Sequence, residues 1–220
     1  MILSKDIFHF LSELKHHNNR DWFNENKHRH IEAKEQIETL IGGLIAKLAE
    51  FDPHINHGIS PRKCLFRIYR DIRFSKDKTP YKTWYSAGIS IDGRKLDGPE
   101  YYLHIEPGAS YLATGYWRPY RDHLQQIRQE IDYNAKALFS ALKEGGFQKK
   151  DLSTHGKLKR APAGYSEEDE HIELLKLKNF ILNIKVPDSV FLSKDAESSI
   201  AEEYKKMYPF KRFIHHALDQ

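Results

Sequence analysis

Two pairs of polar residues, each two positions apart, are the first candidates for chemistry. Arg67 and Tyr69 lie in "KCLFRIYRD", and His104 and Glu106 lie in "YYLHIEPG". Residues two apart in a strand point to the same face, so each pair lies opposite the apolar side chains around it. An imidazole beside a carboxylate can work as a general base with its orienting partner. A guanidinium can donate two parallel hydrogen bonds to a phosphate or carboxylate.

These pairs predict a polar cleft on one face of a sheet, with Ser86 and Tyr102 beside them. In this interpretation His104 is the catalytic base, Glu106 orients it, and Arg67 and Tyr102 bind the ligand. A structural interpretation is equally open, in which Arg67 pairs with Glu106 across the sheet and the tyrosines are ordinary cross-strand partners. A metal site that combines His104, Glu106 and a distant histidine is a less favoured alternative.

A basic loop, "DIRFSKDKTPYKT", follows the first pair. Its lysines, hydroxyl side chains and Thr-Pro bond make a poor strand but a good anion-binding loop. The flanking Phe74 and Tyr81 either anchor the loop or stack on a planar ligand. Taken alone, the loop also fits a solvated hairpin. The predicted ligand-binding residues are Arg67, Tyr69, Arg70, Asp71, Arg73, Ser75, Lys76, Lys78, Lys82, Tyr102 and Arg118.

Positive charge is concentrated around this loop. The chain of 220 residues has a formal net charge of +4, whereas the segment 57–82 holds eight Lys or Arg against two Asp. A local excess of this kind attracts anions. It favours a phosphate-bearing small molecule, with nucleic acid as the first alternative and an acidic protein surface as the second.

The composition places limits on the class of protein. Hydrophobic residues at 40% and aromatic residues at 12% are typical of an ordered globular chain. The single cysteine, Cys64, excludes an internal disulfide, which fits a cytoplasmic location. We expect no membrane partner, because the sequence has neither a signal peptide nor a long apolar run. Known phosphate loops, dinucleotide fingerprints and nucleophile elbows do not occur, so neither a cofactor nor an oligomeric state follows from the sequence.

Hydrophobic periodicity predicts the elements that must position these residues. Helical spacing predicts a helix that begins after Ser4, a longer one that Asn19 caps and that ends before "FDP", and others over 120–131, 135–143, 172–175, 196–207 and 209–218. Alternation predicts strands in "KCLFRIYRD", "TWYSAGISI", "YYLHIEPG", "SYLATGYW" and "KNFILNIKV". Together these elements predict a single α+β domain over residues 1–220, with a mainly antiparallel sheet of about five strands backed by N- and C-terminal helices.

The order of the motifs resembles a known family. The segments "NNRDWFNENKHRH", "RIYRDIRFSKDKTPYKT", "YYLHIEPG", "GYWRP", "RAPAGY" and "LKLKNF" are similar to the family catalogued as domain of unknown function 2461, from about residue 4 to residue 215. The characteristic residues of that family fall on the same segments that the spacing selects, including His104 and Glu106. The family has no established activity to transfer, so the resemblance implies no ligand.

Overall fold

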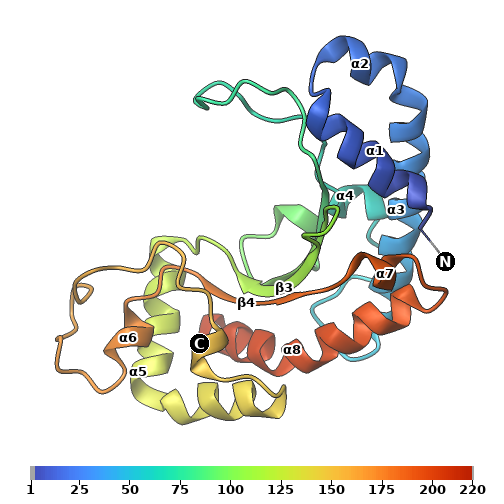
Figure 1. The fold of residues 1–220 in the computed structure, drawn as a ribbon. Coiled ribbons are helices and arrows are strands. Elements are labelled where there is room, and N and C mark those ends of the chain that lie inside the picture. The colour runs from blue at the N-terminus through green and yellow to red at the C-terminus, as the bar shows by residue number, and fades with distance from the viewer. Residues whose placement is uncertain (1–2, 220) are drawn as a thin grey trace. The chain divides into compact units, whose positions relative to one another are not determined.

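The computed structural model describes residues 3–219 (Figure 1). By their internal contacts, these residues divide into two compact units. The first unit consists of the residues up to Lys95, Tyr102–Leu112 and Lys185–Glu202. The second consists of Leu96–Tyr101, Ala113–Ile184 and the residues from Glu203 onward. The prediction of a single domain therefore stays a prediction.

Helices α1 (Lys5–His16), α2 (Arg20–Glu25) and α3 (Lys27–Ala49) begin the first unit. The apolar residues of α1 recur at helical spacing, so Ile7, Leu11 and Leu14 line one buried face. α3 packs against α1 and buries a longer row that ends at Leu48. The predicted first helix is confirmed.

The predicted long helix after Asn19 is interrupted at Asn26. Asn19 does cap α2, because its side chain accepts a hydrogen bond from the Trp22 N–H at 3.0 Å. Asn26 ends α2 and begins α3, and its Nδ2 donates to the Trp22 carbonyl at 2.9 Å. Asparagine side chains compete for backbone hydrogen bonds in this way, which periodicity does not reveal.

The sheet is antiparallel and has four strands in the order β1-β2-β3-β4. The strands are β1 (Tyr85–Ile89), β2 (Glu100–Ile105), β3 (Tyr111–Tyr116) and β4 (Phe180–Lys185). Four predicted strands and the α+β class are thus confirmed, whereas the count of about five strands is wrong.

The segment "KCLFRIYRD" accounts for the missing strand. Pro61 begins a short helix, α4 (Pro61–Cys64), as proline favours the first helical position. Beyond it, Leu65 and Tyr69 make only isolated bridges, to Ala87 and Tyr81 respectively. The segment first touches β1 and then folds back on itself as a hairpin, so it never forms a continuous ladder.

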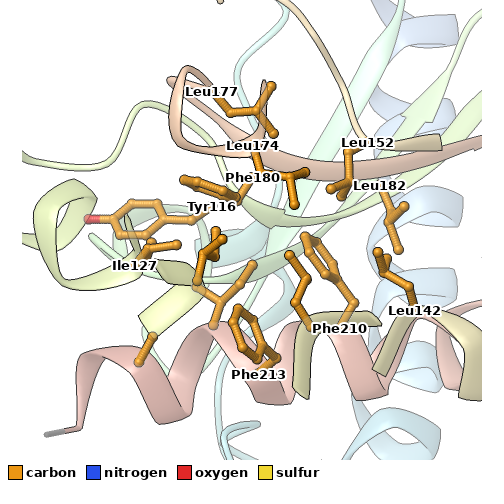
Figure 2. Close-up of a cluster of buried hydrophobic side chains, with 14 of the residues drawn as sticks. Tyr116, Ile127, Leu142, Leu152, Leu174, Leu177, Phe180, Leu182, Phe210 and Phe213 are labelled. Atoms are coloured by element: carbon orange, nitrogen blue, oxygen red, sulfur yellow. The ribbon is translucent and has the colours of Figure 1, made fainter. Parts of the chain in front are cut away.

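The core of the second unit gathers side chains from α5 (Arg121–Glu144), α6 (Ile172–Leu175), β4 and α8 (Ala196–Leu218) (Figure 2). Phe180 and Leu182 of β4 are fully buried in this cluster with Phe210 of α8. Each such side chain stabilises the fold by about 1.5–3 kcal/mol on burial. The carboxyl-terminal part of α8 therefore packs on the sheet.

Two predicted helix breaks have different outcomes. Asn134 has non-helical dihedrals (φ −144°, ψ 49°) and kinks α5 where a break was predicted. Pro209, by contrast, lies inside the continuous helix α8. Proline in a helix interior is unfavourable, but the buried Phe210 and Phe213 beside it hold the helix against the core.

Gly115 permits a close approach of strands β3 and β4. Its φ is +125°, and an added Cβ would lie 2.0 Å from the Phe180 carbonyl oxygen. Only glycine fits there, because any side chain would clash with backbone.

Short elements complete the fold: η1 (Gly93–Lys95), η2 (Lys149–Asp151) and α7 (Asp188–Phe191). Among the helices described, none combines the length and apolar character needed to cross a bilayer.

Candidate functional site

The predicted site residues fall into two groups in the first unit, with one outlier. The first group is the arm, residues 69–81. The second, the sheet-face cluster, lies at the polar end of β2 and consists of Phe66, Arg67, Lys82, Trp84, Tyr102, His104, Glu106 and Tyr111. Arg118 belongs to the second unit. The arm carries the predicted residues Tyr69, Arg70, Asp71, Arg73, Ser75, Lys76 and Lys78.

The arm is a hairpin that projects from the helices of its unit (Figure 1, teal). The Arg70 N–H donates to the Pro80 carbonyl at 2.9 Å, and the Lys82 N–H donates to the Ile68 carbonyl at 2.8 Å. At the tip, the Phe74 side chain is 95% exposed. The predicted anion-binding loop is therefore the end of a protruding hairpin.

Tyr81 anchors the arm. Its ring stacks on Phe23, with centroids 3.9 Å apart and an interplanar angle of 12°. The Asn18 amide pairs with the Tyr81 backbone in both directions, donating from Nδ2 at 2.9 Å and accepting at Oδ1 at 3.0 Å. Of the two roles predicted for Tyr81, the contacts favour the anchor, because its ring is 4% exposed.

Acidic neighbours engage two of the arm's arginines. Arg70 binds Asp77 and Thr79, and Arg73 contacts Asp71 at 2.7 Å. The Arg73 guanidinium lowers the pKa of Asp71 to about 2. The Thr79 N–H, followed by Arg70, lowers the pKa of Asp77 to about 2. Both acids are ionised at neutral pH, so these two arginines are partly neutralised within the arm.

A cavity of about 390 Å³, the arm-base pocket, lies where α2 meets the arm. This volume lies within the range of small-molecule sites. Arg20 and Asn24 come from α2, and the Arg20 side chain has no hydrogen bond or ion pair with any residue in the range 3–219. The lining residues are Arg20, Asn24, Tyr69, Arg70, Ile72, Pro80 and Tyr81.

Sequence reasoning placed Tyr69 and Arg70 at the site and missed Arg20 and Asn24. The only signal for Arg20 was its place in the motif "NNRDWFNENKHRH", which lies about fifty residues before the arm. Its proximity to the arm depends on the contact between Phe23 and Tyr81. Spacing along the chain could not supply that contact.

In the sheet-face cluster, the predicted alternation of β2 holds. His104 is 6% exposed, and its Nε2 lies 3.0 Å from Glu106 Oε2. Its Nδ1 lies 3.4 Å from the Tyr102 hydroxyl. The imidazole stacks with Trp84 and Tyr111, at centroid distances of 5.5 and 4.5 Å. Both ring nitrogens and both ring faces therefore have defined neighbours.

The hydrogen bonds assign the tautomer of His104. An ionised carboxylate only accepts, so Nε2 carries the proton that faces Glu106. Burial lowers the pKa of His104 below its usual value, and the Glu106 carboxylate opposes this only in part. At neutral pH the ring is neutral, and its Nδ1 lone pair faces Tyr102.

Two residues of this cluster, Arg67 and Lys82, are cations. The Lys82 ammonium lies 5.6 Å from the centre of the Phe66 ring. Burial, and then the charge of Arg67, lower the pKa of Lys82. Within residues 3–219, neither Lys82 nor Arg67 has an ion pair, and Glu106 pairs with His104 instead of Arg67. The cross-sheet pair between Arg67 and Glu106 is therefore not formed.

Two other predicted positions lie apart from these sites. Ser86 is 4% exposed on β1, a strand whose residues are all buried, so it lines no open cleft. Arg118 has a φ of 52°, its N–H donates to Asn179 Oδ1 at 2.8 Å, and its guanidinium lies over the Trp117 ring.

The alternative of a metal bound by His104 and Glu106 needs a third ligand. The part of the chain that the structure describes contains no group of three or more His, Cys, Asp or Glu side chains arranged to hold a metal ion.

Comparison with known proteins supports the resemblance seen in the sequence. Residues 6–213 match the family described as "Conserved hypothetical protein (DUF2461)". No significant match is found among the curated proteins or the solved structures. The match covers nearly the whole chain, so the protein belongs to the DUF2461 family.

Proposed function

We propose that the protein binds a phosphate-bearing or other anionic small molecule in the arm-base pocket. The observation that carries the proposal is the guanidinium of Arg20, which lines a pocket of small-molecule size and has no acidic partner among residues 3–219. Arg20 is exposed, so an anion in the pocket can reach its guanidinium without displacing an acidic side chain of the protein. A bound anion would supply that partner.

The other lining residues fit such a ligand. The planar fork of Arg20 matches two phosphate oxygens, and the Asn24 amide can donate a further hydrogen bond. Tyr69 is 48% exposed and offers a ring face to a planar group such as a nucleobase. Arg70 adds positive potential, reduced by its pair with Asp77.

A thermal-shift screen at low salt tests this proposal. The compounds are inorganic phosphate, nucleotides, sugar phosphates and polyphosphate, because a ligand that binds only the folded state raises its stability by mass action. At one hundred times its Kd, a ligand adds about 2.7 kcal/mol, which corresponds to a rise in Tm of several degrees. We expect Arg20→Ala to reduce the rise clearly and the exposed Arg121→Ala to preserve it in full. An equal rise in Arg20→Ala, or no rise with any compound, would contradict the proposal.

Single-stranded nucleic acid is a second candidate ligand, and Phe74 is the observation that favours it. Phe74 is 95% exposed at the tip of a basic hairpin, so its ring is accessible to a base. Aromatic side chains stack on bases at about 1–3 kcal/mol each, and nearby cations such as Lys76 attract the phosphate backbone.

Fluorescence anisotropy with a labelled single-stranded oligonucleotide separates the two candidates. Binding at the tip should weaken about tenfold or more in Phe74→Ala, fall steeply with salt, and be little changed in Arg20→Ala. If oligonucleotide affinity is lost in Arg20→Ala and retained in Phe74→Ala, the arm-base pocket is the site and the second candidate is rejected.

A further inference from the structure

The sheet-face cluster contains an ordered chain of three polar groups, called the relay below, that do not line the arm-base pocket. It runs from the Glu106 carboxylate through the His104 imidazole to the Tyr102 hydroxyl, at 3.0 and 3.4 Å. All three residues lie on one face because they are two apart along β2 and its end. The geometry therefore repeats the acid, imidazole and hydroxyl order of a catalytic triad.

The proton positions also follow that order. Nε2 of His104 donates to Glu106, which leaves the Nδ1 lone pair facing the Tyr102 hydroxyl. A neutral imidazole in this tautomer can accept the phenolic proton, and the carboxylate then stabilises the imidazolium that forms. The distance of 3.4 Å is long for a hydrogen bond, as is common for catalytic groups without a substrate.

The surroundings hold the imidazole in this orientation. Trp84 and Tyr111 stack on its ring, with interplanar angles of 29° and 19°. At the end of β2, the Glu106 N–H donates to Ser110 Oγ at 3.1 Å, and the same hydroxyl lies 2.9 Å from the Glu106 carbonyl. The acid is thus fixed by its own turn, and the base by its aromatic neighbours.

Two cations beside the relay indicate the charge of a substrate. The Lys82 ammonium lies 5.6 Å from the centre of the Phe66 ring, and that ring lies 6.2 Å from the Tyr102 ring. In agreement with this placement, the charge of Lys82 lowers the pKa of His104, and the charge of Arg67 lowers the pKa of Lys82. No carboxylate among residues 3–219 pairs with either cation. An anionic group of the substrate would relieve this repulsion.

We propose that the Tyr102 hydroxyl is a nucleophile that attacks a phosphate ester, with His104 as its general base and Glu106 as a positioning residue. In the step, the phenolic proton moves to His104 Nδ1 as Tyr102 Oη forms a bond to phosphorus. The bond from phosphorus to the ester oxygen breaks in line with the attack, and its electron pair leaves with that oxygen, which takes a proton from water. The imidazolium then releases the phenolic proton to solvent. Lys82 and Arg67 bind the phosphate oxygens.

The test is the rate at which p-toluenesulfonyl fluoride modifies each tyrosine of the full chain, followed by peptide mass spectrometry. In this reaction the tyrosine oxygen bonds to sulfur, fluoride leaves, and the proton passes to a base. Tyr133 is the internal standard, because its side chain is 90% exposed. The relay predicts that Tyr102 reacts at least tenfold faster than Tyr133, although it is less exposed. Labelling that follows exposure instead would overturn the proposal.

Variants separate the relay from a structural role. We expect His104→Gln to slow Tyr102 at least tenfold and Glu106→Gln to slow it several-fold, with the Tyr133 rate unchanged in both. If His104→Gln does not fold, the Tyr102 rate in Glu106→Gln, a change at a partly exposed residue, still tests the relay. Unchanged Tyr102 rates in the folded variants would refute the assignment of base and positioning residue.

The pH profile is a readout that a structural role would not change. The titratable or charged groups that face His104 are Glu106, Tyr102, Tyr111 and Lys82. With the relay, the Tyr102 rate is nearly constant between about pH 7 and 9, because the base is already neutral. His104→Gln should restore the rise of about tenfold per pH unit toward the usual phenol pKa of about 10, whereas Glu106→Gln, which keeps the base, should retain the flat profile at a lower rate.

A last arm of the experiment tests the substrate class. Inorganic phosphate should slow the labelling of Tyr102 in the native chain, and Arg67→Ala should remove this protection. We expect Arg20→Ala to leave this protection intact while it weakens ligand binding at the arm-base pocket, so the two proposals can fail independently. If phosphate gives no protection, the assignment of a phosphate ester is wrong.

Discussion

The arm and the cationic residues of the sheet-face cluster are adjacent in the sequence, yet they differ in whether their cations have acidic partners. In the arm, Arg70 and Arg73 pair with Asp77 and Asp71, acids that lie seven and two residues away. In the sheet-face cluster, Lys82 and Arg67 have no acidic partner within residues 3–219, because Glu106 is engaged by His104. The arm thus neutralises two of its own cations, whereas the sheet-face cluster neutralises neither Lys82 nor Arg67.

The comparison shows that charge density in a sequence is a poor measure of charge available to a ligand. Exposed pairs such as Arg73 with Asp71 are screened by water and contribute little to stability. A half-buried cation without a partner, such as Lys82, costs free energy and is more informative about a ligand. At the base of the arm, Arg20 is exposed and has no acidic partner among residues 3–219, whereas Arg70 is paired with Asp77.

The largest expected effect lies at the anchor of the arm. Tyr81→Ala removes a ring that is 4% exposed and stacked on Phe23, so we expect the free energy of unfolding to fall by about 3–5 kcal/mol. Phe74→Ala, at the exposed tip, should change it by less than about 0.5 kcal/mol. Urea denaturation of both variants measures the difference. Equal losses would mean that the tip also packs on the protein.

The next effect is a dependence of stability on pH through His30, beside the anchor. Its Nδ1 lies 2.7 Å from the Tyr85 hydroxyl, and burial, followed by the charges of Lys34 and Lys27, lowers the pKa of His30 to about 4. The unfolded chain, with a histidine pKa of about 6.5, binds the proton first as the pH falls. Stability is therefore complete above pH 6.5 and decreases between pH 6.5 and 4.

We expect this decrease to amount to about 2 kcal/mol, allowing for the partial exposure of His30. Urea denaturation across this pH range measures it. His30→Gln should flatten the profile between pH 6.5 and 4, whereas the exposed His28→Gln should not. If the free energy of unfolding of the native protein does not change between pH 6.5 and 4, His30 is protonated in the folded state without a loss of stability.

The smallest effect on stability should accompany a measurable effect on binding. Asp77→Ala releases Arg70 at the edge of the arm-base pocket and should alter the free energy of unfolding by less than about 1 kcal/mol. At the same time it should tighten the binding of a phosphate-bearing ligand several-fold at low salt, as measured by titration calorimetry. Unaltered or weaker binding would show that Asp77 supports the pocket instead of competing with its ligand.

Much of the fold could be predicted from periodicity, because local spacing determines which face of an element is apolar. The helix after Ser4, the kink at Asn134 and four strands followed from that rule. The break at Asn26 and the continuity of α8 through Pro209 did not, since side-chain hydrogen bonds and core packing decided them. The prediction of about five strands was wrong for a related reason. Whether "KCLFRIYRD" pairs with a neighbouring strand depends on where the chain turns back.

The candidate sites, like the fold, could be predicted from the sequence only in part. Alternation correctly placed Tyr102, His104 and Glu106 on one face of β2, since a strand repeats every two residues. It could not show that Glu106 would pair with His104 instead of Arg67, which is a matter of side-chain distances. Arg20 was missed because it approaches the arm only through a contact between segments distant in sequence.

By itself, the sequence determined the α+β class, four of the strands, the family and the stretch in which cations and aromatic residues gather. These properties depend on residue type and short-range spacing, which a linear pattern contains. The tertiary structure decided which charges are neutralised, which tyrosine faces a histidine lone pair, and where a pocket forms. Those outcomes depend on distances between residues far apart along the chain, because a hydrogen bond is lost on a displacement of about one ångström and electrostatic energies weaken as the distance grows.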